Sequence, residues 1–286
     1  MYHGVLSDHD ANGDGDWLQV RASEFEDQMR YLARHYEVTD FANALSRKKT
    51  SKPLAIVTFD DGYANNCSVA LPILKKFSLP ATIFVTTGFV DTPRQFWWDR
   101  LRSGLGVGKS PSKEDEDKLK SLHPYSIDAA VEAILDSSKG TRSPFPMESY
   151  RALNRREIGE LLESGLIELG SHTHQHEILL GLSDDEVHST LRLSSEALSK
   201  WGTTGRWFAA PNGDFRIDQL KLVQAAGYEI CVGTRPTGLW KAPLDRFSIP
   251  RIGIGRGLSI DEFALATSGA IAWAKSLRTR PTHKSS

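Results

Sequence analysis

The sequence contains very little cysteine, only Cys67 and Cys231 in 286 residues. Two thiols cannot build the disulfide framework of a small secreted domain, and nothing around them has the spacing of a zinc-binding cysteine pair. We therefore expect two free thiols in a protein from a reducing compartment.

Long apolar runs and an excess of charge of one sign are also missing. The best candidate for a membrane helix, residues 263–274, is interrupted by Thr267, Ser268 and Gly269, and residues 1–16 are polar, without the apolar region of a secretory signal. Lys plus Arg number 35 against 36 Asp plus Glu, so no basic surface for nucleic acid or anionic membrane is indicated. We expect a cytoplasmic protein without nucleic-acid partners; the short Met1–Tyr2 segment before His3 leaves room for an upstream segment in the natural chain.

What the sequence does contain is an alternation of strand and helix patterns. Residues 54–59 and 81–86 are apolar and rich in β-branched side chains, and Val69, Ile73 and Phe77 between them have helical spacing. This order predicts a βαβ unit with parallel strands. The alternation continues with strands predicted at 166–170, 206–210, 228–232 and 249–252, and with helices predicted after the Ser23–Glu26 capping box, after Asp40, at 155–164, 183–200 and 220–226, and after Ser259.

One region departs from this alternation. After the aromatic cluster at residues 96–99, residues 102–150 are rich in glycine, serine and charge, with helical spacing regained at 126–135. We predict an irregular, partly helical insertion of the kind that often covers a cleft. The chain is then one α/β domain over residues 1–277 with this insertion, followed by a disordered tail at 278–286.

Two carboxylates stand where the first strand of the βαβ unit ends. Asp60 and Asp61 follow residues 54–59 directly, and Gly62 comes next. Active sites of parallel α/β folds gather at the carboxyl ends of strands. The alternative is an ordinary turn, because Asp-Gly is a common turn dipeptide.

Histidines follow another strand. His172 and His176 come after residues 166–170, and their spacing allows both imidazoles to reach one ion. The pattern alone has a high false-positive rate, but the carboxylates at a second strand end favour a metal site. His174, between them, is interpreted as a supporting or solvent-facing residue.

These motifs carry a family resemblance. Thr58-Phe59-Asp60-Asp61-Gly62-Tyr63 and His172-Thr173-x-x-His176 resemble the first two motifs of the polysaccharide deacetylase family, carbohydrate esterase family four, also called the NodB-homology domain. Residues 208–213, Phe-Ala-Ala-Pro-Asn-Gly, are similar to the third motif, and the match extends over about residues 1–254. The resemblance implies a distorted (β/α) barrel with fewer than eight strands and a metal-dependent N-deacetylase site at the strand ends.

The family's chemistry can be carried over onto matching residues. By this resemblance Asp61, His172 and His176 hold a divalent metal, most simply zinc, with cobalt or nickel as alternatives. Asp60 is the implied general base. The backbone amide of Asn212 is placed like the family's oxyanion donor.

The sequence also departs from the family pattern. Ala209 occupies the position of an arginine that holds the base, and Arg251 is our candidate substitute, with a surface or core-edge arginine as the alternative. The late Leu-x-His motif, which supplies a general acid, is missing after Gly253. Met1-Tyr2-His3 resembles that motif moved to the front of the chain, as in a subgroup that begins with a Tyr-His pair. His3 is therefore the proposed acid, and a disordered terminal histidine is the alternative.

Aromatic side chains are candidates for contact with a sugar. Trp97, Trp98 and Trp240 have the character of rings that stack on sugars, with buried packing as the alternative, and Tyr63 ends the first motif.

Three functions are open at this point. The first is metal-dependent removal of N-acetyl groups from an amino sugar in a polysaccharide, oligosaccharide or glycolipid precursor. The second is hydrolysis of another carbon–nitrogen bond, in a formyl or cyclic amide. The third is a catalytically weak glycan-binding homologue, suggested by Ala209 and the missing late histidine.

Overall fold

A computed structural model of the chain describes residues 1–11, 17–46, 51–105, 111–138, 147–234 and 246–270. Its centre is a parallel sheet of five strands in the order β5-β6-β7-β8-β9. The strands of this sheet are β5 (Val57–Phe59), β6 (Ala81–Val85), β7 (Ile167–Ser171), β8 (Trp207–Ala209) and β9 (Ile230–Val232). All four pairings between neighbouring strands are parallel, as the βαβ pattern predicts.

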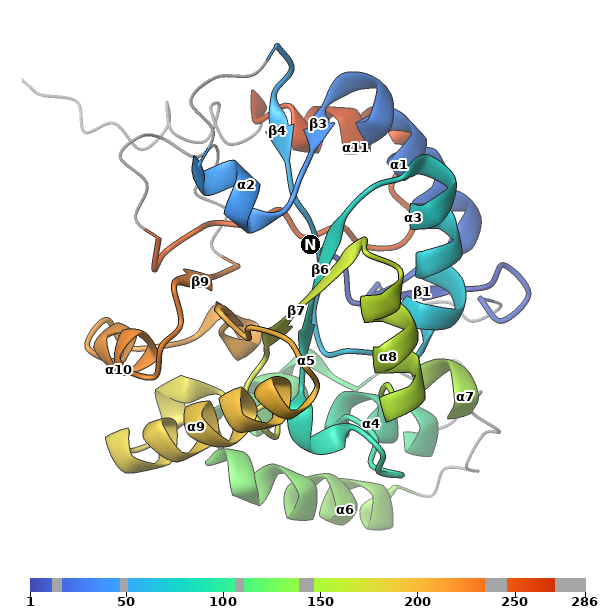
Figure 1. Cartoon of the computed structure of the whole chain (residues 1–286). Helices are drawn as coiled ribbons and strands as arrows, with labels where there is room; N and C mark the ends of the chain where they lie inside the picture. The colour runs from blue at the N-terminus through green and yellow to red at the C-terminus, as the bar shows by residue number, and fades with distance from the viewer. Residues whose placement is uncertain (12–16, 47–50, 106–110, 139–146, 235–245, 271–286) are drawn as a thin grey trace, which may run out of the picture.

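Helices surround the curled sheet (Figure 1). On one side α1 packs against α3 and α11, and on another side α9 packs against α10 and β7. These and the other framework helices are α1 (Ala22–His35), α2 (Phe41–Ser46), η1 (Asn66–Ala70), α3 (Leu71–Phe77), η2 (Thr87–Phe89), α8 (Arg155–Glu163), η4 (Leu179–Gly181), α9 (Asp184–Lys200), η5 (Pro211–Gly213), α10 (Gln219–Ala225) and α11 (Ile260–Thr267). The arrangement confirms the α/β prediction, a distorted barrel with helices outside.

The first residues of the chain run beside β5 and contact residues 252–254. Tyr2 forms a parallel bridge with Phe59, and Ile249 forms one with Val232 on the opposite edge of the sheet. The Ile254 N–H donates to the Met1 carbonyl at 2.9 Å. The first and last segments of the barrel are therefore neighbours.

Two further pairs of strands lie outside the central sheet. One parallel pair consists of β1 (Gly4–Leu6) and β2 (Gln19–Arg21), and the other consists of β3 (Glu37–Val38) and β4 (Leu54–Ala55).

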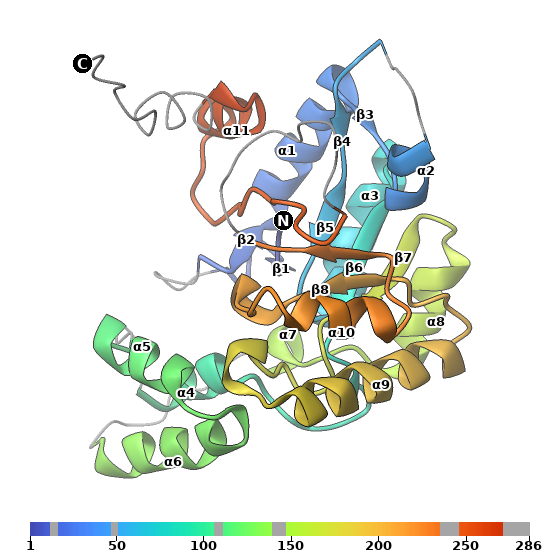
Figure 2. The ribbon, with the colours of Figure 1, turned by 90° about the vertical axis from the view of Figure 1, so that its left-hand side faces the viewer.

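The insertion forms a helical layer that projects from the barrel (Figure 2). It begins with the helix that starts at Trp97, five residues before the predicted start at 102. Its helices are α4 (Trp97–Leu105), α5 (Lys113–Ser121), η3 (Pro124–Ser126), α6 (Ile127–Ser137) and α7 (Met147–Tyr150). They share a small apolar core that includes Phe96, Leu101 and Val131 and that also takes in Tyr63 from the barrel. The insertion is thus packed onto the first motif.

Several local predictions were wrong in detail. The Ser23–Glu26 capping box does not form, because α1 already begins at Ala22 and the Ser23 hydroxyl donates to Asp8 instead. The helix expected around Val69 begins as a π-helical turn, and its α-helical part starts at Leu71, immediately before Pro72, where a missing N–H is tolerated.

One further prediction needs correction, and one helix was not predicted. Residues 249–252 contribute one bridge at Ile249 rather than a strand. The cluster around Trp98 is the start of helix α4, which the aromatic composition hid. By contrast, Ser183 and Ser259 cap α9 and α11 as predicted, whereas the predicted tail at 278–286 lies outside the described residues.

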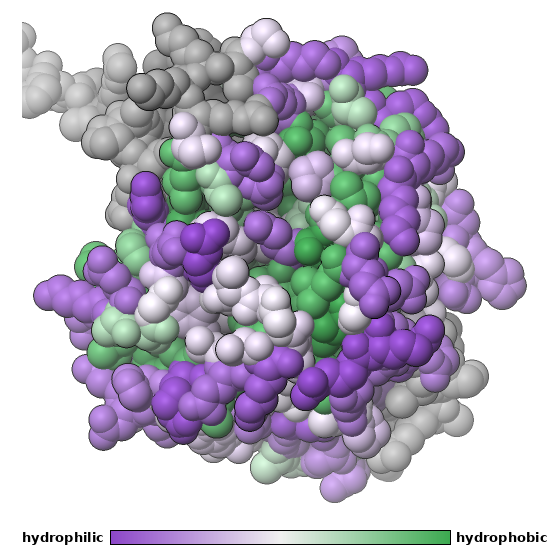
Figure 3. Space-filling model, viewed as in Figure 1, coloured by the Kyte–Doolittle hydropathy of each residue, from purple (hydrophilic) through white to green (hydrophobic). Residues whose placement is uncertain are grey.

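Apolar side chains fill the space between sheet and helices. In Figure 3 the margins of the visible face are mostly hydrophilic and hydrophobic side chains appear around its centre. A cavity of about 630 Å³ lies between the outer side of β5, α11 and residues 249–254.

Within the described part of the chain, every helix is too short or too polar to cross a bilayer.

Candidate metal and catalytic site

The first motif turns sharply where β5 ends. Asp61 has a φ of 72°, in the left-handed region that most side chains avoid, and Gly62 follows with a φ of 83°. The Asp60 N–H donates to the Tyr2 carbonyl, and the Asp61 carbonyl accepts from the Thr86 N–H. Both carboxyl groups are buried at the end of the sheet as a result.

The second motif turns in the same way after β7. Thr173 and His176 have φ values of 63° and 59°. The Glu177 N–H donates to the Thr173 hydroxyl at 2.9 Å, which closes the turn. Such strained backbone is typical of functional sites, and here it places both imidazoles on one side.

His172 is held in one tautomer. Its Nδ1 lies 2.8 Å from the Ala209 carbonyl oxygen, which can only accept, so Nδ1 carries the proton. Burial lowers the pKa of His172 to about 4, against the nearby Asp60 carboxylate, which raises it. The imidazole is therefore neutral at pH 7, with the lone pair on Nε2 available to a metal.

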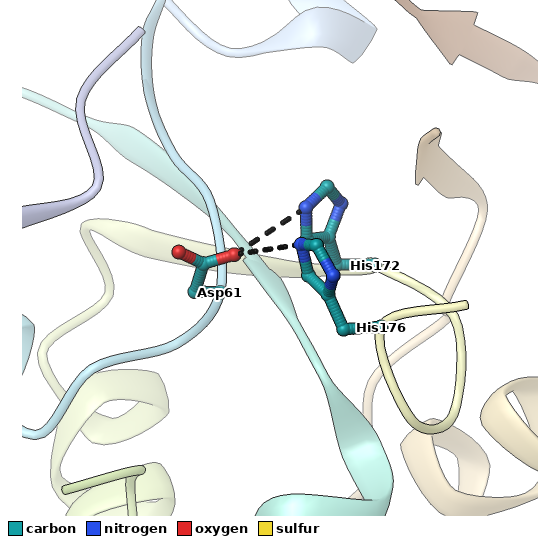
Figure 4. A group of neighbouring side chains, drawn as sticks. All are labelled: Asp61, His172 and His176. Atoms are coloured by element: carbon teal, nitrogen blue, oxygen red, sulfur yellow. Dashed lines mark ion pairs between the residues drawn. The ribbon is translucent and has the colours of Figure 1, made fainter. Parts of the chain in front are cut away.

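Asp61, His172 and His176 converge on one point (Figure 4). Asp61 Oδ1 lies 3.5 Å from His172 Nε2 and 3.4 Å from His176 Nε2. One ligand atom from each of the three buried residues lies within 4.8 Å of the others. The structure thus brings together the three residues that the sequence predicts to hold a metal.

The surroundings of these residues fit a divalent cation. Burial opposes ionisation of Asp61, but the hydrogen bond with His176 and the charges of His3, His176 and His172 hold the pKa of its carboxyl below the usual range. In the described part of the chain, Asp61 Oδ2 is buried without a hydrogen-bond partner. One carboxylate and two imidazoles form a donor set that zinc commonly takes.

Asp60 is paired with Arg251. Arg251 Nη1 and Nη2 donate to Asp60 Oδ1 and Oδ2 at 2.6 and 2.7 Å, which is a bidentate ion pair. Although burial raises the pKa of Asp60, the guanidinium, with His172 and His3, lowers it well below its usual range. The structure therefore places Arg251 at the carboxylate for which the sequence proposes it, away from the surface.

His3 and Asn212 were also predicted as site residues, and they lie next to strands of the fold. His3 follows Tyr2, which bridges Phe59, and the charge of its imidazole contributes to the lowered pKa of both Asp60 and Asp61. Asn212 follows β8 with a φ of 57° and an exposed side chain.

Tyr63 and Trp98 occupy supporting positions. Tyr63 is fully buried; its hydroxyl donates to Asp99 Oδ2 at 2.7 Å and accepts from Trp98 Nε1 at 2.8 Å. In this conformation Tyr63 offers no surface to a substrate, contrary to the role expected for it. Trp240 lies outside the described residues.

A small cavity adjoins the metal site. It measures about 120 Å³ and is lined by Trp97, Trp98, Tyr125 and His176, among others. Arg94, on its wall, donates to Gln175 Oε1 at 2.9 Å. The insertion therefore supplies aromatic side chains close to the predicted metal ligand His176.

Three of these features were missed from the sequence. Asp99 and Tyr125 belong to the insertion, and the buried carboxylate of Glu177 accepts from the Thr190 hydroxyl at 2.9 Å. The signal for Asp99 was present, since this carboxylate directly follows Phe96, Trp97 and Trp98 in the sequence. His174 has the supporting place expected of it, with Nδ1 2.9 Å from the Thr87 hydroxyl.

Comparisons with known proteins agree with this geometry. The family profile described as polysaccharide deacetylase matches residues 47–231. YxkH of Bacillus subtilis (strain 168), which carries the name of a polysaccharide deacetylase, is 23% identical over 269 residues, 92% of this chain and 73% of that protein. Poly-beta-1,6-N-acetyl-D-glucosamine N-deacetylase of Escherichia coli (strain K12) is 32% identical over 270 residues, and the alignment covers 92% of this chain but 37% of the longer protein.

A solved structure supports the fold. Streptococcus pyogenes deacetylase PplD, determined in complex with acetate, superimposes with a TM-score of 0.65 at 19% identity, covering 93% of this chain and 95% of PplD. At that identity the likeness establishes the shared barrel.

Proposed function

Because this chain belongs to the polysaccharide deacetylase family, we propose that it hydrolyses the acetamide groups of N-acetylglucosamine units in a polysaccharide. The observation that carries the proposal is the buried cluster of Asp61, His172 and His176 beside an ion-paired Asp60. An amide is a poor electrophile and neutral water is a poor nucleophile, so the site has to activate both the amide carbonyl and the attacking water.

Asp61, His172 and His176 would hold a divalent metal, and zinc suits their nitrogen and oxygen atoms best. When bound, such an ion acts as a Lewis acid that polarises the acyl oxygen and makes water more acidic. The Ala209 carbonyl keeps the His172 Nε2 lone pair directed at the shared point.

Asp60 would take the proton from the attacking water. The fork of Arg251 fixes both carboxylate oxygens and keeps the group ionised, so it enters the reaction as a base. A carboxylate with a lowered pKa is a weak base, and it depends on water that has been made more acidic. As the water oxygen bonds to the acetyl carbon, charge develops on the acyl oxygen, where the Asn212 N–H would donate.

His3 would complete the reaction. Protonation of the amine nitrogen allows the carbon–nitrogen bond to break, which releases acetate and leaves a glucosamine unit. His3 stands beside Asp60 and Asp61 at the junction between the first segment and β5, where the charge of its imidazole reaches both carboxyls.

The cavity beside His176 supports a sugar substrate over a small amide. Its aromatic walls and its Arg94 and Asp128 side chains combine apolar faces with hydrogen-bonding groups, as sugar-binding sites do. A formyl or cyclic amide would leave this cavity without a role.

Acetate release from β-1,6-linked N-acetylglucosamine oligomers, measured alongside metal content, tests the proposal. The parent protein should contain about one divalent ion per chain and release acetate. Asp60→Asn should retain the metal and lose turnover, because the proton acceptor is removed while Asp61, His172 and His176 are unchanged. Release of formate or ammonia from small amides alone would favour the second function, and glycan binding without turnover would favour the third.

A further inference from the structure

The two metal-binding histidines are held in different ways. A ligand histidine usually donates its second ring N–H to an oxygen, which fixes the direction of the ring. His172 does so toward the Ala209 carbonyl. His176 does not: its Nδ1 is buried and has no hydrogen-bond partner among the described residues.

Aromatic rings surround His176 instead. The Trp98 ring lies 4.7 Å from the His176 ring at an interplanar angle of 63°, and the Phe96 ring lies 6.0 Å away. Trp98 also packs face to face on Phe96, with ring centroids 4.8 Å apart. The direction of the His176 lone pair therefore depends on where Trp98 sits.

Trp98 is itself fixed by a chain of hydrogen bonds. Its Nε1–H donates to the Tyr63 hydroxyl at 2.8 Å, and that hydroxyl donates to Asp99 Oδ2 at 2.7 Å. Tyr63 has one hydroxyl proton, and the buried Asp99 carboxylate takes it, so an oxygen lone pair of Tyr63 must face the indole. The two hydrogen bonds therefore run in one direction, from the Trp98 indole to the Tyr63 hydroxyl and from that hydroxyl to the Asp99 carboxylate.

We propose that Asp99, Tyr63 and Trp98 are positioning residues that fix the ring of His176 toward the metal. This inference rests on the metal centre of the proposed function and adds to it a role for the insertion, since Trp98 and Asp99 belong to α4. Asp99 is a fully buried carboxylate with Arg102 Nη1 3.5 Å away, an arrangement that packing alone does not require.

Metal affinity, measured without reference to turnover, tests the inference. Apoprotein is titrated with Zn²⁺ against a chromophoric chelator for the parent, Tyr63→Phe and Trp98→Phe. Each variant keeps an aromatic ring and loses the hydroxyl or the indole N–H. We expect Zn²⁺ to bind about 10- to 100-fold more weakly to each, as for other groups that orient metal ligands. The double variant should bind Zn²⁺ only slightly more weakly than the single variant with the lower affinity, because both changes break the same hydrogen bond between Trp98 and Tyr63.

A matched control separates positioning from general destabilisation. Trp207→Phe also removes an indole N–H bond from a buried ring, to Glu168 Oε2 at 2.9 Å, at the start of β8 and away from the Ala209 end that contacts His172. Its urea midpoint should fall while its Zn²⁺ affinity stays at the parental value. In the Co²⁺-loaded proteins, the visible absorption bands should change in Trp98→Phe and remain unchanged in Trp207→Phe.

The outcomes are distinguishable. If Tyr63→Phe and Trp98→Phe bind Zn²⁺ as tightly as the parent and resemble Trp207→Phe in urea, the three residues serve only the core, and the inference is overturned while the proposed function stands. If the parent itself binds no divalent ion at this site, both the inference and the metal-dependent function are overturned.

Discussion

Arg251 and Asp60 are 191 positions apart in the sequence and form a buried, bidentate ion pair. Their side chains are only 6% and 3% exposed, so the pair is shielded from water and from salt. The family resemblance implies an arginine at position 209, where this chain has an alanine. Arg251 brings a guanidinium to Asp60 from the segment that follows the Ile249 bridge.

Replacing Arg251 should separate charge from geometry. Arg251→Lys keeps a positive charge but cannot form the bidentate contact with Asp60. The loss of one charge-assisted hydrogen bond, worth about 1.5–3 kcal/mol, should lower kcat for acetate release by about 10- to 100-fold. Metal content should not change. Arg251→Met leaves Asp60 ionised and unpaired in the interior and should destabilise the fold by about 3–5 kcal/mol in urea titration.

The control for Arg251 is a surface pair of the same type. Arg206 and Glu229 are 3.0 Å apart with side chains 40% and 42% exposed. Arg206→Lys should change stability by less than about 1 kcal/mol and leave turnover unaltered. Parental turnover in Arg251→Lys would contradict the holding role.

The metal centre was predictable because its residues lie in short motifs. Asp60 and Asp61 follow one strand, and His172 and His176 follow another, so a strand assignment suffices to bring them to one edge of the sheet. Because β5 pairs with β6 and β6 pairs with β7, all in parallel, the two motifs lie at the same edge of the sheet.

The supporting residues were not predictable in this way. Asp99 acts through Tyr63, 36 positions earlier, and the contact exists only because α4 packs on the end of the barrel. Likewise the start of α1 is decided by Asp8, which binds Ser23 from 15 positions away and removes it from capping. Local pattern cannot report contacts that depend on tertiary packing.

Metal removal should destabilise the protein reversibly. An ion that binds only the folded state adds about 4 kcal/mol when present at a thousandfold excess over its Kd. Treatment with EDTA should therefore lower the thermal midpoint, and Zn²⁺ should restore it. His176→Ala should abolish this shift, whereas His174→Ala should keep it, because His174 Nδ1 faces Thr87 rather than the metal site. A shift that persists in His176→Ala would place the ion elsewhere.

His3 can be tested as the general acid. Removing a positioned acid typically costs about 10²- to 10⁴-fold in rate. His3→Ala should lower kcat by an amount in this range with unchanged metal content, since His3 is not among the ligands. His9→Ala is the matched control, because the His9 side chain is 94% exposed on the same segment. Turnover in His3→Ala equal to that in His9→Ala would assign the acid to another group.

Tyr125 offers a test of the sugar-binding cavity. Its ring is 55% exposed and lines the space beside His176, so it is free to meet a sugar next to the one that reacts. An aromatic contact of about 0.5–1.5 kcal/mol predicts that Tyr125→Ala raises KM for an oligomer about 2- to 10-fold and leaves kcat and the KM for a single N-acetylglucosamine unit unchanged. Ile217→Ala, at an apolar side chain that is 84% exposed in the loop before α10, is the control. Equal KM values for the oligomer in parent and Tyr125→Ala would mean that the polysaccharide follows another path across the insertion.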